Sequence, residues 1–224
     1  MPSPAAHVRS VNVGMPVDHA WAGKLGRTAI EKHAVSGPVQ VDALGLDGDQ
    51  VADTKHHGGV HQAVYAFARE DLDAWQSRLG MELSDGQFGE NLTTTGIDVN
   101  AALIGERWRI GSALLEVADV RIPCNVFKGW MGRRGLDEKG WVKRFTAEGR
   151  PGPYLRVIEP GSITAGDAIV VEHRPDHDVT VTLMFAAFTT ERALLPRLLD
   201  AGDALPPKAR ATAVAARDQA TSAR

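Results

Sequence analysis

The single cysteine of the chain, Cys124, is the residue best suited to covalent or metal chemistry. It lies in the segment Arg121-Ile122-Pro123-Cys124-Asn125. A neighbouring guanidinium favours the thiolate, which attacks electrophiles and binds soft metals. Because Pro123 fixes φ and lacks a backbone donor, we expect Cys124 to follow a stiff turn. A lone thiol forms no internal disulfide and no multi-cysteine metal cluster. The alternative is an inert cysteine that packs as a small apolar residue.

Three histidines and two glycines occur together in the segment His56-His57-Gly58-Gly59-Val60-His61. Histidine is a common zinc ligand, but the glycines exclude a regular HxxxH helix and no carboxylate stands at a familiar spacing. Zinc is therefore not favoured. Glycine lets backbone N–H groups approach an anion closely, so an anion-binding loop is the functional prediction. The alternative is a plain turn before a strand at 63–67.

A third polar segment reads Phe88-Gly89-Glu90-Asn91-Leu92-Thr93-Thr94-Thr95-Gly96. On its own it is typical of a turn whose Asn and Thr side chains bond their own backbone. The sequence contains no GxGxxG, GxxxxGK[ST] or GxSxG pattern. Dinucleotide-binding, P-loop and α/β-hydrolase functions are therefore disfavoured.

Positive charge is concentrated between Arg121 and Arg156, where the sequence contains nine Lys and Arg residues but only three Asp and Glu residues. The whole chain has 25 basic and 28 acidic residues and a net charge of −3. That balance argues against a general nucleic-acid binder. The local excess predicts a basic wall that concentrates an anionic ligand. The alternative is a solvated helix face.

The elements that position these segments are mostly short strands. The 224 residues are 43% hydrophobic and 24% charged, as in a soluble globular protein. No stretch approaches the about 18 apolar residues of a membrane span, and no signal peptide is visible, so we expect a cytoplasmic protein without membrane contact. Alternation and glycine-rich turns predict strands, which lie at 8–13, 39–41, 63–67, 108–110, 113–120, 155–158 and 168–172.

The strand pattern predicts a mostly β, α+β fold, with a barrel or sandwich as its sheet architecture. Apolar periodicity predicts helices at 70–79 and 138–148, each followed by a glycine. Composition changes near Pro175, so we expect a domain at 1–175 and a C-terminal helical extension at 176–224. Its short helices should break at Pro196 and at Pro206-Pro207, and its last dozen residues should fray.

Several of these segments, in this order and spacing around the sole cysteine, resemble the MOSC family, named for the C-terminal domain of molybdenum cofactor sulfurase, and in particular its free-standing YiiM-like subgroup. The resemblance runs from about residue 8 to residue 174. The matching segments are Gly45-Leu46-Asp47-Gly48-Asp49-Gln50-Val51-Ala52-Asp53, His57-Gly58-Gly59, Ala63-Val64-Tyr65, Phe88-Gly89-Glu90-Asn91-Leu92, Ile104-Gly105-Glu106 and Arg121-Ile122-Pro123-Cys124. One departure is Gly152-Pro153-Tyr154, where the family has Gly-Trp-Tyr.

The resemblance implies a MOSC-type β-barrel that binds the molybdenum–molybdopterin cofactor, with the Cys124 thiolate as the metal ligand. It implies catalytic roles for Cys124, Arg121, Asn91 and Glu90. The cofactor-binding residues that it implies are His57, Gly58, Gly59, His61, Phe88, Gly89, Asn91, Leu92, Thr93, Arg121 and Arg156.

The chemistry implied by the resemblance is two-electron reduction of N-hydroxylated compounds such as N-hydroxylaminopurines. The chain has no flavin, haem or iron–sulfur motif, so an external flavin or iron–sulfur protein would supply the electrons. A homodimer is also an expectation. One alternative is a sulfur carrier or cofactor-handling protein that uses a persulfide on Cys124. Another is a small-molecule binding module in which Cys124 is inert.

Overall fold

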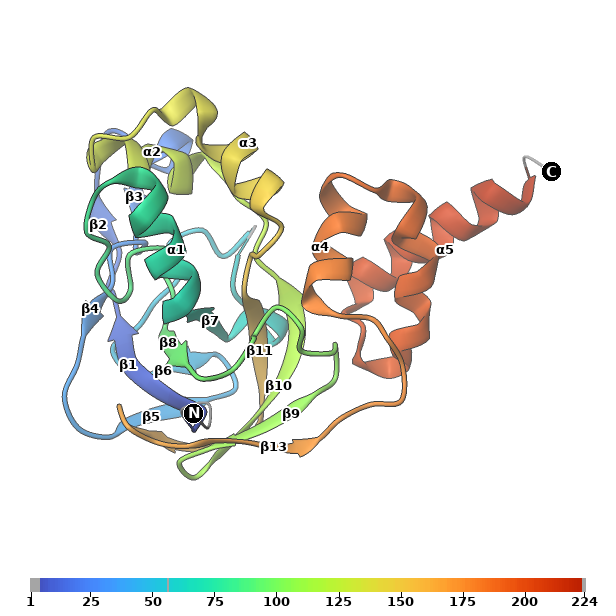
Figure 1. The fold of residues 1–224 in the computed structure, drawn as a ribbon, viewed down its shortest axis with the longest axis horizontal. Coiled ribbons are helices and arrows are strands. Elements are labelled where there is room, and N and C mark those ends of the chain that lie inside the picture. Colours follow the sequence, from blue (N-terminus) through green and yellow to red (C-terminus); the bar gives the residue numbers. More distant parts are fainter. Residues whose placement is uncertain (1–4, 56, 223–224) are drawn as a thin grey trace.

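A computed structural model describes residues 5–55 and 57–222 and shows a mixed α+β protein built on one large sheet (Figure 1). The eight strands of this sheet follow the order β13-β9-β10-β11-β7-β8-β1-β4. Neighbouring strands are antiparallel except β7 and β8, which are parallel. The strands are β1 (His7–Val13), β4 (His33–Ala34), β7 (Val64–Ala68), β8 (Leu92–Thr95), β9 (Arg107–Ile110), β10 (Ala113–Val120), β11 (Pro153–Glu159) and β13 (Ile169–His173).

Two small sheets and two short 3-10 helices complete the strand-rich part. β12 (Gly161–Ile163), β5 (Val39–Asp42) and β6 (Gly45–Leu46) form one sheet, and β2 (Val17–Asp18) pairs with β3 (Arg27–Thr28). The 3-10 helices are η1 (Gly23–Leu25) and η2 (Val60–Gln62). The predicted strands are all present. Their apolar residues are buried on one face in β5 and β9, and on both faces in β7 and β10.

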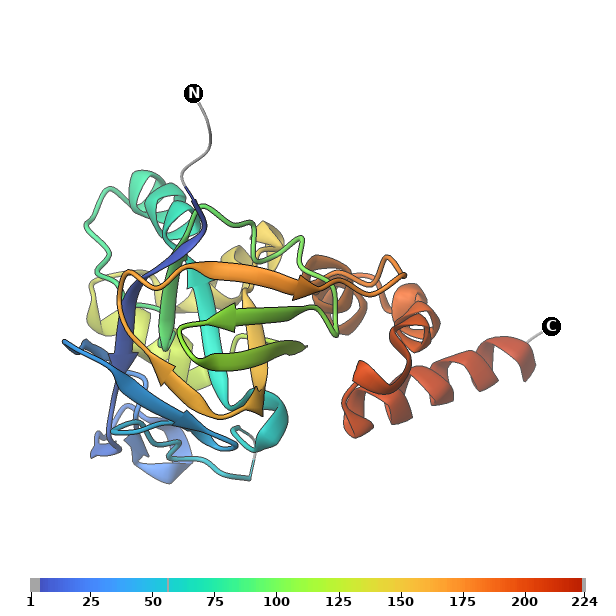
Figure 2. The same ribbon diagram turned by 90° about the horizontal axis from the view of Figure 1, so that it is seen from below.

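The large sheet curves around the core (Figure 2). The start of β1 meets the segment just before β13 through an isolated bridge between His7 and Ala168. The N–H of Val8 donates to the carbonyl of Asp167 at 2.9 Å, and the N–H of Gly166 donates to the carbonyl of Val8 at 2.7 Å. Among the described residues no longer ladder joins these strands, so the predicted closed barrel is not confirmed.

Three helices cover one end of the sheet (Figure 1). They are α1 (Arg69–Leu79), α2 (Asn125–Arg133) and α3 (Glu138–Glu148). The predicted helices at 70–79 and 138–148 correspond to α1 and α3, which end at Gly80 and Gly149 in the left-handed conformation that favours glycine. Helix α2 was not predicted, because Gly129 and Gly132 interrupt its apolar pattern.

An aromatic cluster fastens these helices to each other. It consists of Trp75, Phe88, Phe127, Trp141 and Phe145, each at most 3% exposed. The ring centroids of Phe127 and Trp141 lie 5.4 Å apart and those of Trp75 and Trp141 lie 5.0 Å apart. Burying one such ring stabilises the fold by about 1.5–3 kcal/mol. The start of α2 is thus held at a defined place beside the sheet.

The residues after 175 fold as helices at the other end of the molecule (Figure 1): α4 (Val181–Thr189), η3 (Arg192–Ala204) and α5 (Pro207–Ser222). The Thr180 hydroxyl caps α4 by accepting the N–H of Leu183 at 3.0 Å. Helix α5 begins at Pro207, as expected for a proline at the first helical position. Pro196 lies inside η3, so the predicted break there is wrong; the kink is at Gly202. The division at residue 175 stays a prediction.

Within the described residues, no helix is both long and apolar enough to span a membrane.

Candidate functional site

Cys124 lies between the end of β10 and the start of α2, where it is the N-cap residue and is half-buried. Burial raises the pKa of the thiol, but a hydrogen bond from His57 and the charge of Arg121 outweigh it, so the pKa falls from 9.0 to about 7. The N–H of Phe127 adds to this effect without meeting the geometry of a capping bond. About half of the thiol is therefore thiolate at pH 7.

Arg121 is the buried cation beside the thiol. It is 7% exposed, and its guanidinium carbon lies 5.0 Å from the Tyr65 ring centre and 4.9 Å from that of Phe127. Burial lowers the pKa of Arg121, but the charges of Tyr154, Tyr65 and Cys124 raise it above the ordinary value, so the cation persists. Arg121 also hydrogen-bonds Tyr154. Its Nε has no hydrogen-bond partner among the described residues, which leaves a buried donor free for a ligand.

A second buried cation, Lys32, lies in the same region and was missed by sequence reasoning. Its side chain is 7% exposed and pairs with Asp49, which is 8% exposed. Burial lowers the pKa of Lys32. The nearby carboxylates of Asp49 and Glu90 raise this pKa, and the positive charge of Arg121 lowers it. Lys32 and Arg121 are thus close enough to repel each other. Two buried cations at such separation favour an anionic ligand.

The loop at 88–93 is held mainly by its own hydrogen bonds. Glu90 is fully buried, and its carboxylate accepts the N–H of Gly86 at 2.6 Å, the N–H of Phe88 at 2.9 Å and the hydroxyl of Thr93 at 2.9 Å. Burial raises the pKa of Glu90 to about 7. In this structure Glu90 therefore fixes the loop. Leu92 starts β8, and a Cβ at Gly89 would lie 3.8 Å from Arg121 Nη1.

Asn91 joins three parts of the site. Its Oδ1 accepts the N–H of Tyr65 at 3.0 Å, and its Nδ2 donates to the carbonyl of Asn12 at 3.2 Å and to Asp49 at 2.9 Å. Asp49 is also the partner of Lys32. Asn91 thus sets the position of the carboxylate that pairs with the buried lysine.

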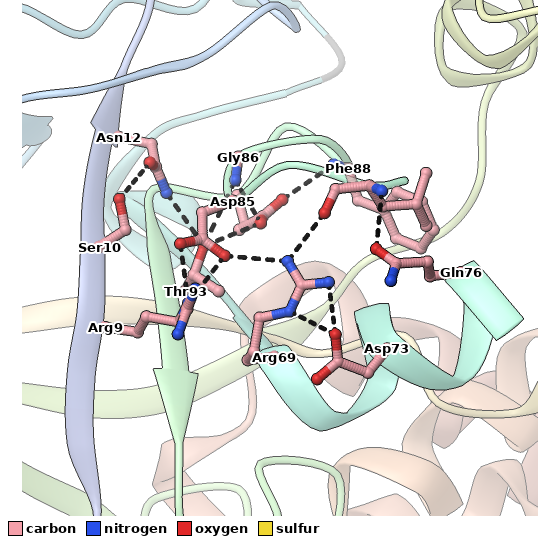
Figure 3. A network of polar contacts seen from close by, with 12 residues as sticks. Arg9, Ser10, Asn12, Arg69, Asp73, Gln76, Asp85, Gly86, Phe88 and Thr93 are labelled. Atoms are coloured by element: carbon pink, nitrogen blue, oxygen red, sulfur yellow. Dashed lines mark hydrogen bonds and ion pairs between the residues drawn. The ribbon is translucent and has the colours of Figure 1, made fainter. Parts of the chain in front are cut away.

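A network of charged side chains attaches this loop to α1 and β1, as Figure 3 shows. Asp85 accepts a bond of 2.9 Å from Arg9 and one of 3.0 Å from Arg69. Arg69 also donates to the carbonyl of Leu83 at 2.9 Å and pairs with Asp73. The segment that carries Phe88 and Glu90 is therefore tied to both a helix and a strand.

The glycine-rich loop brings His57 to Cys124, as the hydrogen bond between them shows. Gly58 and Gly59 have φ of +78° and +80°, a region that side chains rarely adopt. His56 lies outside the described residues. Among the described residues, no group of three His, Cys, Asp or Glu is arranged to hold a metal ion.

His61 and Arg156 lie in a neighbouring charged group. Arg156 pairs at 2.6 Å with Glu116, which is 2% exposed and also pairs with Arg107 at 2.8 Å. Burial lowers the pKa of His61, and the charge of Arg156 lowers it further. Asp119, which raises the pKa of His61, also acts on Tyr154. Tyr154 thus interacts electrostatically with both Asp119 and Cys124.

The predicted basic wall is divided by the fold. Arg121 is inside, Arg156 pairs with Glu116, and Arg150 pairs with Asp71 at 2.6 Å. The remaining basic residues of this segment lie on α2, α3 and the turn between them. The basic residues between Arg121 and Arg156 therefore lie in separate parts of the structure and do not form one continuous wall.

The grooves found in the described part of the chain lie away from Cys124. One of about 720 Å³ runs between η3 and α5 beside Arg192 and Leu195, and one of about 320 Å³ lies beside α1 near Arg69.

The structure thus places a low-pKa cysteine between a strand and a helix of a curved-sheet protein, next to a buried arginine. Residues 53–170 match the family model described as the MOSC domain. The chain therefore belongs to the MOSC domain family.

Three known proteins show how far the likeness extends. Protein YiiM from Escherichia coli is 31% identical over 175 residues, covering 74% of this chain and 75% of that protein. A protein named "Reductase" from Gibberella moniliformis is 36% identical over 152 residues, which are 66% of this chain and 26% of that protein. The crystal structure of YiiM from Geobacillus stearothermophilus has a TM-score of 0.77 at 24% identity, covering 94% of this chain and 98% of that one. This last match concerns the fold.

Proposed function

We propose that this protein is a reductase of N-hydroxylated compounds that binds the molybdenum cofactor through Cys124. The net reaction takes two electrons and two protons to convert an N–OH group to N–H and water. The observation that carries the proposal is the Cys124 thiol, whose pKa is about 7, beside His57 and the buried Arg121. The MOSC family and the relative named as a reductase support it.

The residues present fit the cofactor. A thiolate is a soft ligand that suits a thiophilic metal. The pterin part carries a phosphate, and Lys32, Arg121 and the N–H groups of Gly58 and Gly59 are suited to an anion. The free Nε of Arg121 supplies a buried donor that nothing in the described chain uses. When bound, the metal would supply the two-electron redox chemistry.

The protein residues would act by holding and orienting. His57 and Arg121 keep the Cys124 sulfur deprotonated at neutral pH, which is the form that ligates a metal. Tyr65 and Phe127 enclose the Arg121 guanidinium between their rings and keep it from turning to solvent. Glu90 and Asn91 set the loop positions around it, and the predicted roles of His61 and Arg156 stay predictions.

The test is metal content and turnover of the full chain, made in a host that synthesises the cofactor. We expect near-stoichiometric molybdenum in the wild type and its loss in Cys124→Ala. We also expect reduction of N-hydroxylaminopurine by the loaded protein with an artificial electron donor. Arg121→Ala should lower both occupancy and turnover. Absence of molybdenum from both wild type and Cys124→Ala would contradict the proposal.

The alternative is sulfur transfer, which the same low-pKa thiol favours. The Cys124 thiolate would attack the outer sulfur of a donor persulfide, and the donor thiolate would leave. A mass increase of about 32 Da on the peptide that contains Cys124, together with absent reductase turnover, would favour this function.

A further inference from the structure

The hairpin formed by α2 and α3 carries the largest group of basic side chains without an acidic partner in the described chain. The hairpin has six basic and three acidic residues. Of the acids, Asp137 accepts the N–H of Lys139 at 3.0 Å, Glu148 pairs with Arg78 of α1, and Glu138 forms no ion pair among the described residues. None of its basic residues forms an ion pair within the described part of the protein. These residues are Lys128, Arg133, Arg134, Lys139, Lys143 and Arg144.

Most arginines on the rest of the surface differ in this respect, although Arg192 also forms no ion pair among the described residues. Arg9, Arg107, Arg109, Arg150 and Arg197 each pair with a carboxylate. The protein has a net charge of −3, so the hairpin is a positive region on a weakly negative molecule. Such a region attracts an acidic surface and speeds encounter with it.

The hairpin has apolar surface beside it. Trp130 of α2 donates its indole N–H to the carbonyl of Gln87 at 2.8 Å, and its ring stacks on Trp21 with centroids 6.1 Å apart. The segment around Trp21 includes Met15, Val17 and Leu25, which are 51%, 54% and 49% exposed. Figure 1 shows β2 and β3 of this segment next to α2. Apolar area bordered by charge is the usual composition of a protein interface.

The same helix leads to the candidate site. Helix α2 begins directly after Cys124 and ends at Arg133 after nine residues. At a rise of about 1.5 Å per residue, the helix spans about 14 Å. The N–H of Lys128, at the near end of the basic group, donates to the carbonyl of Cys124 at 3.0 Å, so a carrier docked at this end of the hairpin would lie close to the thiol.

We propose that the α2–α3 hairpin is the docking surface for a small electron-carrier protein with an acidic face, which delivers the reducing equivalents to the site at Cys124. This inference rests on the proposed reductase function. Lys128, Arg133, Arg134, Lys139, Lys143 and Arg144 attract the acidic face, and the apolar residues around Trp21 make contact in the complex.

The test compares the charge-reversed variant Arg133→Glu/Arg134→Glu with Arg192→Glu/Arg217→Glu, which makes the same change of net charge on the C-terminal helices. The probe is an acidic [2Fe–2S] ferredoxin, whose binding to each full-length protein is measured by titration without turnover. At about 20 mM salt we expect the hairpin variant to bind at least about tenfold more weakly than wild type. The control variant should bind as wild type does. At about 0.5 M salt the difference should disappear.

A second arm measures reduction of N-hydroxylaminopurine with a zwitterionic viologen as donor. The hairpin variant should keep the wild-type rate here while losing the ferredoxin-dependent rate, since its chemistry is intact. If the wild type shows no turnover with the viologen, the reductase proposal fails. The ferredoxin titration does not depend on turnover, so it still tests whether the hairpin is a docking surface.

Two results would overturn the docking proposal. One is equal ferredoxin binding by the wild type and the hairpin variant, with both shown to be folded by circular dichroism. The other is binding of duplex DNA or anionic lipid vesicles by the wild type as tightly as ferredoxin, which would mean a general polyanion surface.

Discussion

Replacing His57 with alanine should move the titration of Cys124 toward that of an ordinary thiol. Burial raises the pKa of Cys124, while the hydrogen bond from His57 is the largest of the effects that bring it down to about 7. Arg121 and the N–H of Phe127 remain in the variant, so a partial return toward 9.0 is expected. We expect the pKa to rise by about one unit, which corresponds to about 1.4 kcal/mol.

The assay is alkylation of the cofactor-free protein with iodoacetamide from pH 5.5 to pH 10. The midpoint of the rate profile reports the pKa directly. A full return to 9 would lower the thiolate fraction at pH 7 from about one half to about 1%. A more basic thiolate is also more nucleophilic, so one unit of increase should raise the plateau rate about threefold. The midpoint is therefore the decisive quantity, rather than the rate at one pH.

His61→Ala is the matched control, since His61 follows the same glycines but interacts with Arg156 and Asp119. Its profile should coincide with that of the wild type. A wild-type midpoint near 9, or an equal midpoint in His57→Ala and wild type, would refute the geometry that we describe for Cys124.

Three further outcomes follow from burial and backbone geometry. The pKa of Glu90 is raised to about 7, so the stabilisation by its protonated form is full below about pH 4.5 and is lost as the pH rises through about 7. Urea unfolding at pH 5 and pH 8 measures this pH dependence of the unfolding free energy. Glu90→Gln should remove up to about 3 kcal/mol of it. Gly152→Ala should destabilise by about 3 kcal/mol or more, because φ is +72° and a Cβ would overlap the carbonyl of Ala66. Gly149→Ala, with φ of +70° and open space, should cost only about 1–2 kcal/mol. Trp141→Ala should cost about 3–5 kcal/mol in thermal or urea unfolding, because Trp141 is fully buried among aromatic rings.

Features that are local in the sequence were predictable. Arg121 and Cys124 are three residues apart, so their electrostatic coupling follows from the segment itself. The glycines of the His57 loop indicated unusual backbone, and both have positive φ. The helices α1 and α3 were predicted because their apolar residues repeat with helical spacing.

Features that depend on long-range pairing were not predictable. Lys32 pairs directly with Asp49, whose carboxylate also accepts a bond from Asn91. Asp49 stands in a segment that matches the family, but no local pattern pairs it with Lys32. Tyr154 reaches Arg121 because β11 pairs with β10 and β7. The role predicted for Glu90 near a metal stays a prediction, and its carboxylate accepts bonds within its own loop. The turn interpretation expected the Asn91 side chain to bond its own backbone, whereas it bonds Tyr65, Asn12 and Asp49. Conversely, MOSC family membership was available from motif order alone and is confirmed.

The way the site is assembled makes the reactivity of Cys124 conditional on folding. The groups that lower its pKa come from a loop after β6, from the end of β10 and from the first turn of α2. An unfolded or newly synthesised chain carries an ordinary thiol, with about 1% thiolate at pH 7. For equal access to the reagent, the unfolded thiol reacts several-fold more slowly at neutral pH, because its thiolate is far less abundant although more nucleophilic. The rate at which Cys124 is modified, compared with the rate in the unfolded chain, therefore reports on assembly of the site.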